Sequence, residues 1–140
     1  MKRTISRIKA MIVLYHDDLM KNDYSKEESD YIGRLIDSES EYDEEFFNEL
    51  VSGVKEHLDV IDRYIAISLT NYTIDRLSYV DRALIRIGVY ELKYTDTPKN
   101  IVINEIVNLS HEYSEVKDFN SANINNALLD KIAKRIEDGK

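Results

Sequence analysis

Apolar residues recur at the spacing of an α-helix through most of the chain, and the pattern is strongest from Ser78 to Tyr94. Leu84, Ile87 and Tyr90 recur every three residues there, and further apolar side chains widen the stripe around most of the helix. Ser78 with Asp81 three residues later resembles a capping box, which is typical of a helix start. Because a helix that is apolar on most sides is buried among others, this segment is predicted to be the central helix of a helical domain.

The same periodicity predicts helices on both sides of this segment. A first helix is expected over 4–20, with its buried face formed by Ile5, Ile8, Ile12, Tyr15 and Leu19. Apolar residues then keep the helical period for about five turns over 44–65, which predicts one long helix. Further helices are expected over 26–37, 103–113 and 122–136, the last with Ser121 as its N-cap, and a short turn of helix over 70–77. The predicted fold is therefore all-α, with about seven helices.

Composition supports this fold class and limits the chemistry. Four glycines and one proline supply few turn residues for an all-β fold, and 140 residues are enough for one domain with a real core. The absence of cysteine excludes disulfides, cysteine–zinc sites and thiol catalysis, and it suits the reducing cytoplasm, where we expect the protein to act. No apolar run approaches the length of a membrane span, so no membrane association is expected.

Charge is distributed unevenly along the chain. The net charge of −8 argues against a nucleic acid as partner, because phosphate binding requires lysine and arginine. However, residues 1–9 carry four bases and no acid, whereas residues 17–49 carry 13 acids against three bases. Two interpretations of the basic segment remain open from periodicity alone. Its four cations are either ordinary solvated surface charges or a phosphate-binding patch.

The sequence offers little catalytic chemistry. His16, Asp17 and Asp18 form the one run that invites a metal site, but His57 and His111 have no acidic neighbours at the spacing that a metallohydrolase needs. We therefore interpret the run as part of a helix surface. No phosphate-cradling Gly-Lys-Ser/Thr loop and no Gly-x-Ser-x-Gly motif occurs. The chain is predicted to be a non-enzyme that holds neither a metal nor a cofactor.

Several segments resemble one known family. Residues 71–92 read NYTIDRLSYVDRALIRIGVYEL, and residues 98–109 read PKNIVINEIVNL, which is close to the family pattern Pro-x-x-Val-Val-Ile-Asn-Glu-Ala-Val-Glu-Leu. The pairs Ser6-Arg7 and Leu14-Tyr15 and the ending LLDKIA at 128–133 follow the same order. With these matches over most of its length, the chain resembles the NusB family of transcription antitermination factors.

This resemblance implies an all-α fold of two packed helical subdomains, divided here into 1–70 and 71–140. It also implies two partners, the boxA element of ribosomal RNA leader transcripts and ribosomal protein S10 (NusE), within the RNA polymerase antitermination complex. The implied RNA-binding residues are a basic arm opposite the packed face of the first helix, and the start of the last helix beside it: Lys2, Arg3, Arg7, Lys9, Ser121, Asn123, Ile124 and Asn126. Asp75 and Asp81 would face S10, which is a basic protein.

Two departures from the family pattern leave an alternative open. The family usually carries Gln at the position of Ile12 and an aromatic residue at that of Ile124. Losing one aromatic that stacks on a base lowers RNA affinity by roughly 1–3 kcal/mol, so S10 is expected to supply part of the binding. The alternative function is a protein–protein scaffold on the same fold with weak or no RNA binding. The resemblance allows both a monomer and a homodimer.

Overall fold

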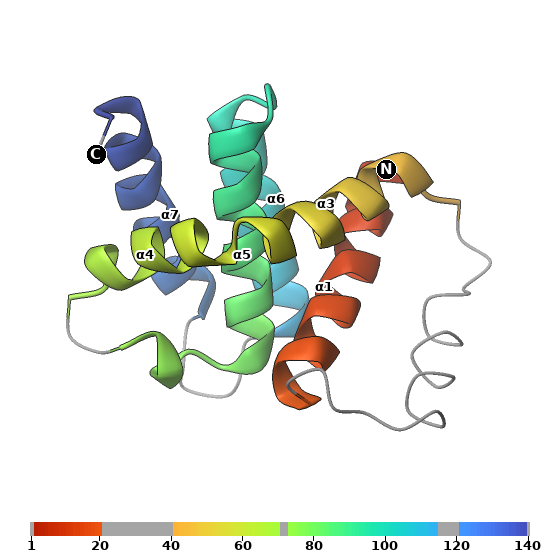
Figure 1. Cartoon of the computed structure of the whole chain (residues 1–140), viewed down its shortest axis with the longest axis horizontal. Helices are drawn as coiled ribbons and strands as arrows, with labels where there is room; N and C mark the ends of the chain where they lie inside the picture. The colour runs from red at the N-terminus through yellow and green to blue at the C-terminus, as the bar shows by residue number, and fades with distance from the viewer. Residues whose placement is uncertain (1, 21–40, 71–72, 115–120, 140) are drawn as a thin grey trace.

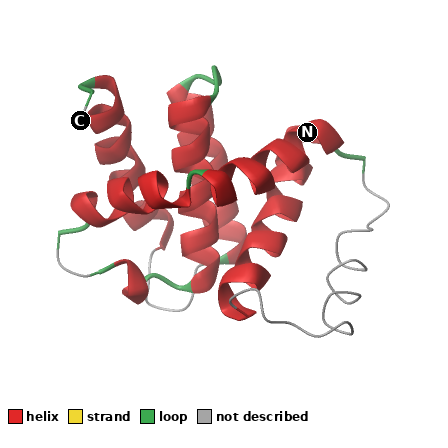
Figure 2. Cartoon of the chain, viewed as in Figure 1, coloured by secondary structure: helices red, strands yellow, loops and turns green. Residues whose placement is uncertain are grey.

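The computed structural model describes residues 2–20, 41–70, 73–114 and 121–139, and these form six α-helices and one 3-10 helix without any strand (Figures 1 and 2). The elements are α1 (Lys2–Met20), α3 (Glu44–Glu56), α4 (Leu58–Ser68), η1 (Ile74–Arg76), α5 (Tyr79–Tyr94), α6 (Lys99–Tyr113) and α7 (Ser121–Glu137). The predicted all-α class is confirmed. The helix predicted over 26–37 lies outside the described residues.

Helix α5 is the centre of the fold, as its sequence predicts. In Figure 1 it stands upright, with α3 and α4 crossing it and with α1, α6 and α7 around it, and it contacts all five of these helices. The hydroxyl of Ser78 accepts a hydrogen bond from the Asp81 N–H at 3.1 Å and so caps the helix start. Gly88 lets α6 and α7 approach closely, because a Cβ at this position would lie 3.0 Å from a methyl of Leu129.

The long helix predicted over 44–65 is in fact two helices, so that prediction is wrong. Helix α3 ends and α4 begins at His57, whose backbone leaves the helical conformation with φ −108° and ψ 22°. The imidazole of His57 stacks on the Tyr94 ring with centroids 4.1 Å apart, which holds the break against α5. Apolar residues keep the helical period across the break, and therefore periodicity could not reveal it.

The buried face of α1 also differs from the predicted one. Ile5, Ile8, Ile12 and Tyr15 are only partly buried, and Leu19 is 42% exposed. The buried residues of α1 are instead Ser6, Arg7, Lys9, Ala10, Met11, Leu14 and Asp17. Small and charged side chains on the inner face bring α1 close to α3 and α5, and they give a weaker apolar signal than the isoleucines do. The predicted inward face is therefore correct only in part, because Ile8, Ile12 and Tyr15 pack against the core while Leu19 is exposed.

One core contains buried residues from all six α-helices. The division into subdomains at residue 70 remains a prediction. No helix among the described residues is long and apolar enough to cross a membrane.

A close contact between α3 and α5 depends on Gly53. A Cβ at this position would overlap the ring of Tyr90, whose hydroxyl donates a hydrogen bond to Glu49 at 3.0 Å. Burial and the Glu49 carboxylate raise the pKa of Tyr90 to about 12, so its phenol keeps the proton that it donates at neutral pH. The absence of a side chain at Gly53 is therefore required for this packing.

We expect Gly53→Ala to lower the free energy of unfolding by about 1–3 kcal/mol, because the new methyl group must displace the Tyr90 ring. This loss is opposed by the helix propensity of alanine, which favours the substitution by about 1 kcal/mol. Urea denaturation measures the net effect. The control is Ser52→Ala at the exposed neighbouring position, with an expected change within about 0.5 kcal/mol. Equal stability of the two variants would contradict the steric argument.

Candidate functional site

Arg7 lies inside the protein and not on an exposed arm. Its side chain is 3% exposed and donates two hydrogen bonds of 2.7 Å to Glu91 of α5 and one of 2.8 Å to Glu105 of α6. Burial disfavours the charged form of the guanidinium and by itself would lower the pKa of Arg7. The hydrogen bond and charge of Glu91, together with the charge of Glu105, outweigh this effect, so the pKa of Arg7 is raised. The Thr4 hydroxyl donates to the same Glu105 at 2.6 Å. The expected position of Arg7 opposite the packed face is wrong.

Lys9 is buried as well, and its ammonium nitrogen lies 4.4 Å from the centre of the Tyr42 ring. This arrangement is a cation–π contact between α1 and the residue just before the N-cap of α3. Beside it, the Ser6 hydroxyl accepts from the Asp43 N–H at 2.9 Å and lies 2.8 Å from the Asp43 carbonyl. Arg7 and Lys9, two of the four residues of the expected arm, therefore hold α1 against its neighbours. The expectation that Lys9 is exposed is wrong.

Lys2 and Arg3 are the exposed bases at the start of α1. Their side chains are 65% and 55% exposed, and each has one long ion pair, to Glu41 at 3.7 Å and to Asp43 at 3.8 Å. Exposed pairs of this kind contribute little and can exchange partners. The guanidinium of Arg3 lies 4.3 Å from the centre of the Phe46 ring. We define the pair Lys2 and Arg3 as the exposed arm.

An open cavity of about 430 Å³ lies next to the exposed arm, lined by Arg3, Phe46, Glu49 and residues 95–98 of the α5–α6 loop. It offers a cation, an aromatic face and the hydroxyl groups of Thr95 and Thr97. Such a combination can accept a flat polar ring beside the Arg3 guanidinium.

The start of α7 does not lie beside this arm. The Asn125 amide donates to Asp81 at 2.9 Å and to the Ser110 hydroxyl at 3.0 Å, which places the start of α7 at the start of α5. Arg7, in contrast, binds Glu91 near the end of α5. Ten residues of helix separate Asp81 from Glu91, or roughly 15 Å along the axis. In Figure 1 the start of α1 and the start of α7 lie toward opposite ends of α5.

The expected residues at the start of α7 differ in accessibility. Asn123 and Asn126 are exposed, and Ile124 is partly buried. Ser121 is buried within the helix, and its hydroxyl has no hydrogen-bond partner among the described residues. Two exposed amides one helical turn apart remain as groups that can meet a ligand.

The two acids expected to face S10 also separate. The Asp75 side chain is 89% exposed, whereas Asp81 is 3% exposed and accepts the hydrogen bond from Asn125. The expectation that Asp81 faces a partner is wrong in this structure, because its carboxylate joins α5 to α7. Arg82 connects Asp75, at 3.7 Å, with Asp18 of α1, at 2.8 Å. The exposed acid therefore lies near the end of α1.

Arg82, which pairs with this exposed acid, also lies over the ring of Tyr79 at 4.6 Å from its centre. The rings of Tyr15 and Tyr79 meet edge to face with centroids 6.3 Å apart, and Tyr79 is 36% exposed. Leu19 lies one turn beyond Tyr15 on the same face of α1 and is also exposed. We call Tyr15, Leu19, Asp75 and Tyr79 the acidic–apolar surface. Periodicity missed it, because it assigned Tyr15 and Leu19 to the buried face.

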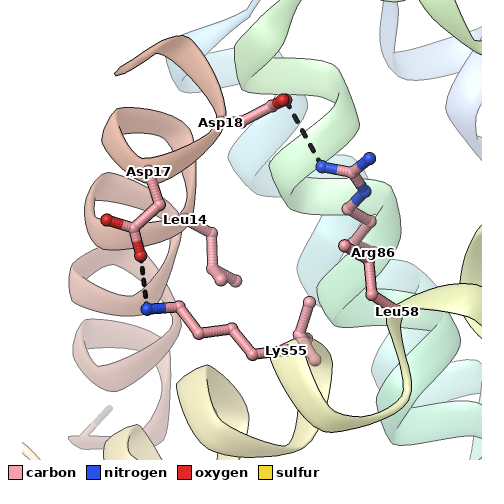
Figure 3. Close-up of a pocket in the computed structure, with 7 residues that line it drawn as sticks. Leu14, Asp17, Asp18, Lys55, Leu58 and Arg86 are labelled. Atoms are coloured by element: carbon pink, nitrogen blue, oxygen red, sulfur yellow. Dashed lines mark ion pairs between the residues drawn. The ribbon is translucent and has the colours of Figure 1, made fainter. Parts of the chain in front are cut away.

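The run from His16 to Asp18 is occupied by structural ion pairs. A cavity of about 310 Å³ lies between α1, α3, α4 and α5, and Figure 3 shows Asp17 and Asp18 at its edge. Asp17 pairs with Lys55 at 2.5 Å, and Asp18 pairs with Arg86 at 3.3 Å. Within the described part of the chain, no three His, Asp or Glu residues are grouped to hold a metal. Asp17 is buried, so its expected place on the helix surface is wrong.

Comparison with known proteins identifies the family. Residues 4–134 match the NusB family. The chain belongs to this family. A protein of Staphylococcus aureus (strain MRSA252) named transcription antitermination protein NusB is 36% identical over 115 residues, which cover 82% of this chain and 88% of that one. Its namesake in Shouchella clausii (strain KSM-K16) is 38% identical over 114 residues, which cover 81% and 82%.

Solved structures agree with the NusB assignment. The structure named "T. maritima NusB, P3121, Form 2" superposes with a TM-score of 0.77 at 28% identity, over 96% of this chain and 92% of that one. A second, named "Crystal Structure of a Plectonemic RNA Supercoil", gives a TM-score of 0.80 at 28% identity, over 98% and 97%. The resemblance seen in the sequence is thus confirmed.

Sequence reasoning missed the aromatic rings beneath the bases of this NusB-family chain. Tyr42 lies under Lys9, and Phe46 lies under Arg3. Phe46 fitted the inward face of its helix, and Tyr42 fell in an acidic loop, so neither carried a separate signal. These lysine and arginine side chains lie 33 or more residues from their aromatic partners in the sequence. Only the tertiary fold brings them into contact.

We expect Arg7→Met to lower the free energy of unfolding by about 3–5 kcal/mol, because Glu91 would be left buried and unpaired. Arg7→Met combined with Glu91→Leu removes both charges, and it should lose less than the single variant. Chemical denaturation of the two variants measures the difference. Lys2→Met, at an exposed position, is the control and should change stability by no more than about 0.5 kcal/mol. A double variant less stable than the single one would argue against this account.

Proposed function

We propose that this chain is a transcription antitermination factor that binds boxA-type single-stranded RNA of ribosomal RNA leader transcripts together with ribosomal protein S10 (NusE). The observation that carries the proposal is a pair of exposed bases, Lys2 and Arg3, held on a rigid helix start in a chain of the NusB family. The factor acts in the RNA polymerase antitermination complex, where it supplies binding surfaces and no catalysis.

RNA capture begins at the exposed arm. Lys2 and Arg3 can exchange their long ion pairs with Glu41 and Asp43 for phosphates, which releases counterions and makes affinity dependent on salt. The cavity beside Arg3 then accepts a base that stacks on the guanidinium plane. Arg7 and Lys9 contribute indirectly, because their buried contacts fix the direction in which the arm leaves the protein.

The exposed amides of Asn123 and Asn126 provide base recognition at the start of α7. An amide offers both a donor and an acceptor, and can therefore distinguish base edges. The separation of roughly 15 Å along α5 requires a strand of several nucleotides to reach both regions. This geometry suits single-stranded RNA, which is extended and exposes its bases.

The acidic–apolar surface is the binding surface for S10. Tyr79 and Leu19 supply apolar area, and Asp75 supplies a negative charge opposite to the net charge of a basic partner. Asp81 is not part of this surface, because its buried carboxylate accepts the hydrogen bond of Asn125. The same hydrogen bond joins the start of α5 to the start of α7. The helix that carries Tyr79 and the helix that carries the exposed amides are therefore connected directly.

A protein–protein scaffold with weak or no RNA binding is the alternative function. Two observations favour it, namely the acids close to both exposed bases and the aliphatic side chain at Ile124. Binding of S10 without measurable RNA affinity at low salt would select this alternative.

We expect the protein with S10 to bind boxA-like RNA more tightly than a scrambled RNA of equal length. Combining Lys2→Ala with Arg3→Ala should weaken binding and make the plot of log affinity against log salt shallower by about 1.4, or 0.7 for each phosphate that the arm neutralises. Filter binding from low to moderate salt measures both quantities. Arg76→Ala, which removes an exposed positive charge at the end of η1, is the control. An unchanged slope would move the RNA site away from the arm.

We expect Asp75→Lys to weaken the binding of S10 by roughly 5–50-fold, about 1–2.5 kcal/mol, because it reverses a charge opposite a basic partner. RNA binding in the absence of S10 and the free energy of unfolding should change little, because the side chain is almost fully exposed. Isothermal calorimetry with purified S10 measures the affinity. Asp59→Lys, which reverses an exposed acid of α4, is the matched control. Equal effects of the two variants would show only a general charge effect.

A further inference from the structure

The second half of α7 carries a group of lysine and arginine side chains that the proposed function does not use. An open cavity of about 340 Å³ lies between the end of α4 and the second half of α7. Its lining consists of Ile67, Ser68, Thr70, Lys131, Lys134, Arg135 and Asp138. Three cations therefore face one acid in a protein whose net charge is −8. A local excess of positive charge in an acidic protein favours an anionic ligand.

The polar groups of this cavity are incompletely paired. Arg135 donates a hydrogen bond of 3.3 Å to the carbonyl of Ile67, which holds its guanidinium at the end of α4. Lys131 and Lys134 are exposed and form no ion pair with any described residue. Ser68 is only 3% exposed, and its hydroxyl has no hydrogen-bond partner within the described ranges. Because this hydroxyl is closed off from solvent, the groups that an anion can reach in the cavity are the two lysines and the exposed Thr70.

The cavity lies toward the same end of the helical bundle as the exposed arm. Thr4 of α1 bonds Glu105 in the first half of α6, and Lys99 at the start of α6 pairs with Glu137 at the end of α7 at 2.8 Å. Figure 1 shows the start of α1 and the end of α7 toward the same side of the fold, with α5 and α6 between them. A strand that leaves the arm across this end of the bundle meets Lys99 and then the cavity.

We propose that this cavity binds a phosphate of the RNA backbone, downstream or upstream of the segment held by the arm. The ammonium groups of Lys131 and Lys134 neutralise the phosphate, and the exposed Thr70 hydroxyl donates a hydrogen bond to one of its oxygens. The inference rests on the proposed RNA binding and extends it to an interaction that is independent of sequence. Free inorganic phosphate shares this chemistry and is the other source of the same anion.

The main test compares a short boxA-like RNA with a longer one that extends the same sequence on both sides. Combining Lys131→Gln with Lys134→Gln should lower affinity for the longer RNA by about 10-fold and make its salt slope shallower by about 0.7 for each phosphate that the lysines neutralise. Affinity for the short RNA should not change. Arg76→Gln removes one exposed positive charge at the end of η1 and is the control. An equal effect on both RNAs, or none on the longer one, overturns the inference.

Failure of the inference and failure of the proposed function give different results. Binding to the RNA backbone does not depend on sequence, so the lysine variant should also weaken a long scrambled RNA. If boxA preference is absent while this lysine effect persists, the proposed function fails and the cavity remains a phosphate site. If boxA preference persists without any lysine effect, only the inference fails.

Two further measurements distinguish RNA phosphate from inorganic phosphate, and phosphate binding from a purely structural role of the lysines. In NMR titrations the longer RNA should shift the amide signals of Ser68 and Thr70, whereas saturable shifts with inorganic phosphate alone and none with RNA would overturn the RNA source. The alternative role of the two lysines is only to stabilise the end of α7 by complementing the helix dipole. In that case Lys131→Gln with Lys134→Gln would lower stability in denaturant without changing affinity for the longer RNA, which overturns the inference.

Discussion

The structure depends on the buried ion pair between Arg7 and Glu91, which Glu105 completes. Burying a guanidinium and a carboxylate costs several kcal/mol per ion, and only short, bidentate geometry of the kind seen here can offset it. The three residues come from α1, α5 and α6, so the requirement to satisfy every charge fixes the relative positions of three helices at once. The start of α1, where the exposed arm begins, is therefore rigid on one side and solvated on the other.

This constraint divides the bases of α1 by function. Arg7 and Lys9 determine where the helix lies, whereas Lys2 and Arg3 remain available to a ligand. A similar division occurs at the other end of α5, where Asp81 is bound to Asn125 and Asp75 remains exposed. In both places one charged residue is buried and paired while another remains exposed at the surface. The length of α5 separates these two places.

Part of the site followed from the sequence and part did not. The Ser78 cap, the central helix and the family resemblance were read correctly from local pattern, because capping and periodicity act over a few residues. The face of α1 was read correctly only in part, since an inner face of serine, alanine and arginine has little hydrophobic signal. The break at His57 was missed for the opposite reason, because the hydrophobic period continues across it. The accessibility of Arg7 and Asp81 depends on partners 84 and 44 residues away.

The sequence by itself determined the fold class, the central role of α5 and membership of the NusB family. These properties depend on the order and spacing of residue types, which the chain carries locally. The tertiary structure alone decided which charged groups are accessible, because burial and pairing depend on contacts between distant segments. Of the four basic residues expected to form an exposed arm, Lys2 and Arg3 are exposed and Arg7 and Lys9 are buried. The tertiary structure also brought the lysines of α7 and the end of α4 together around one cavity.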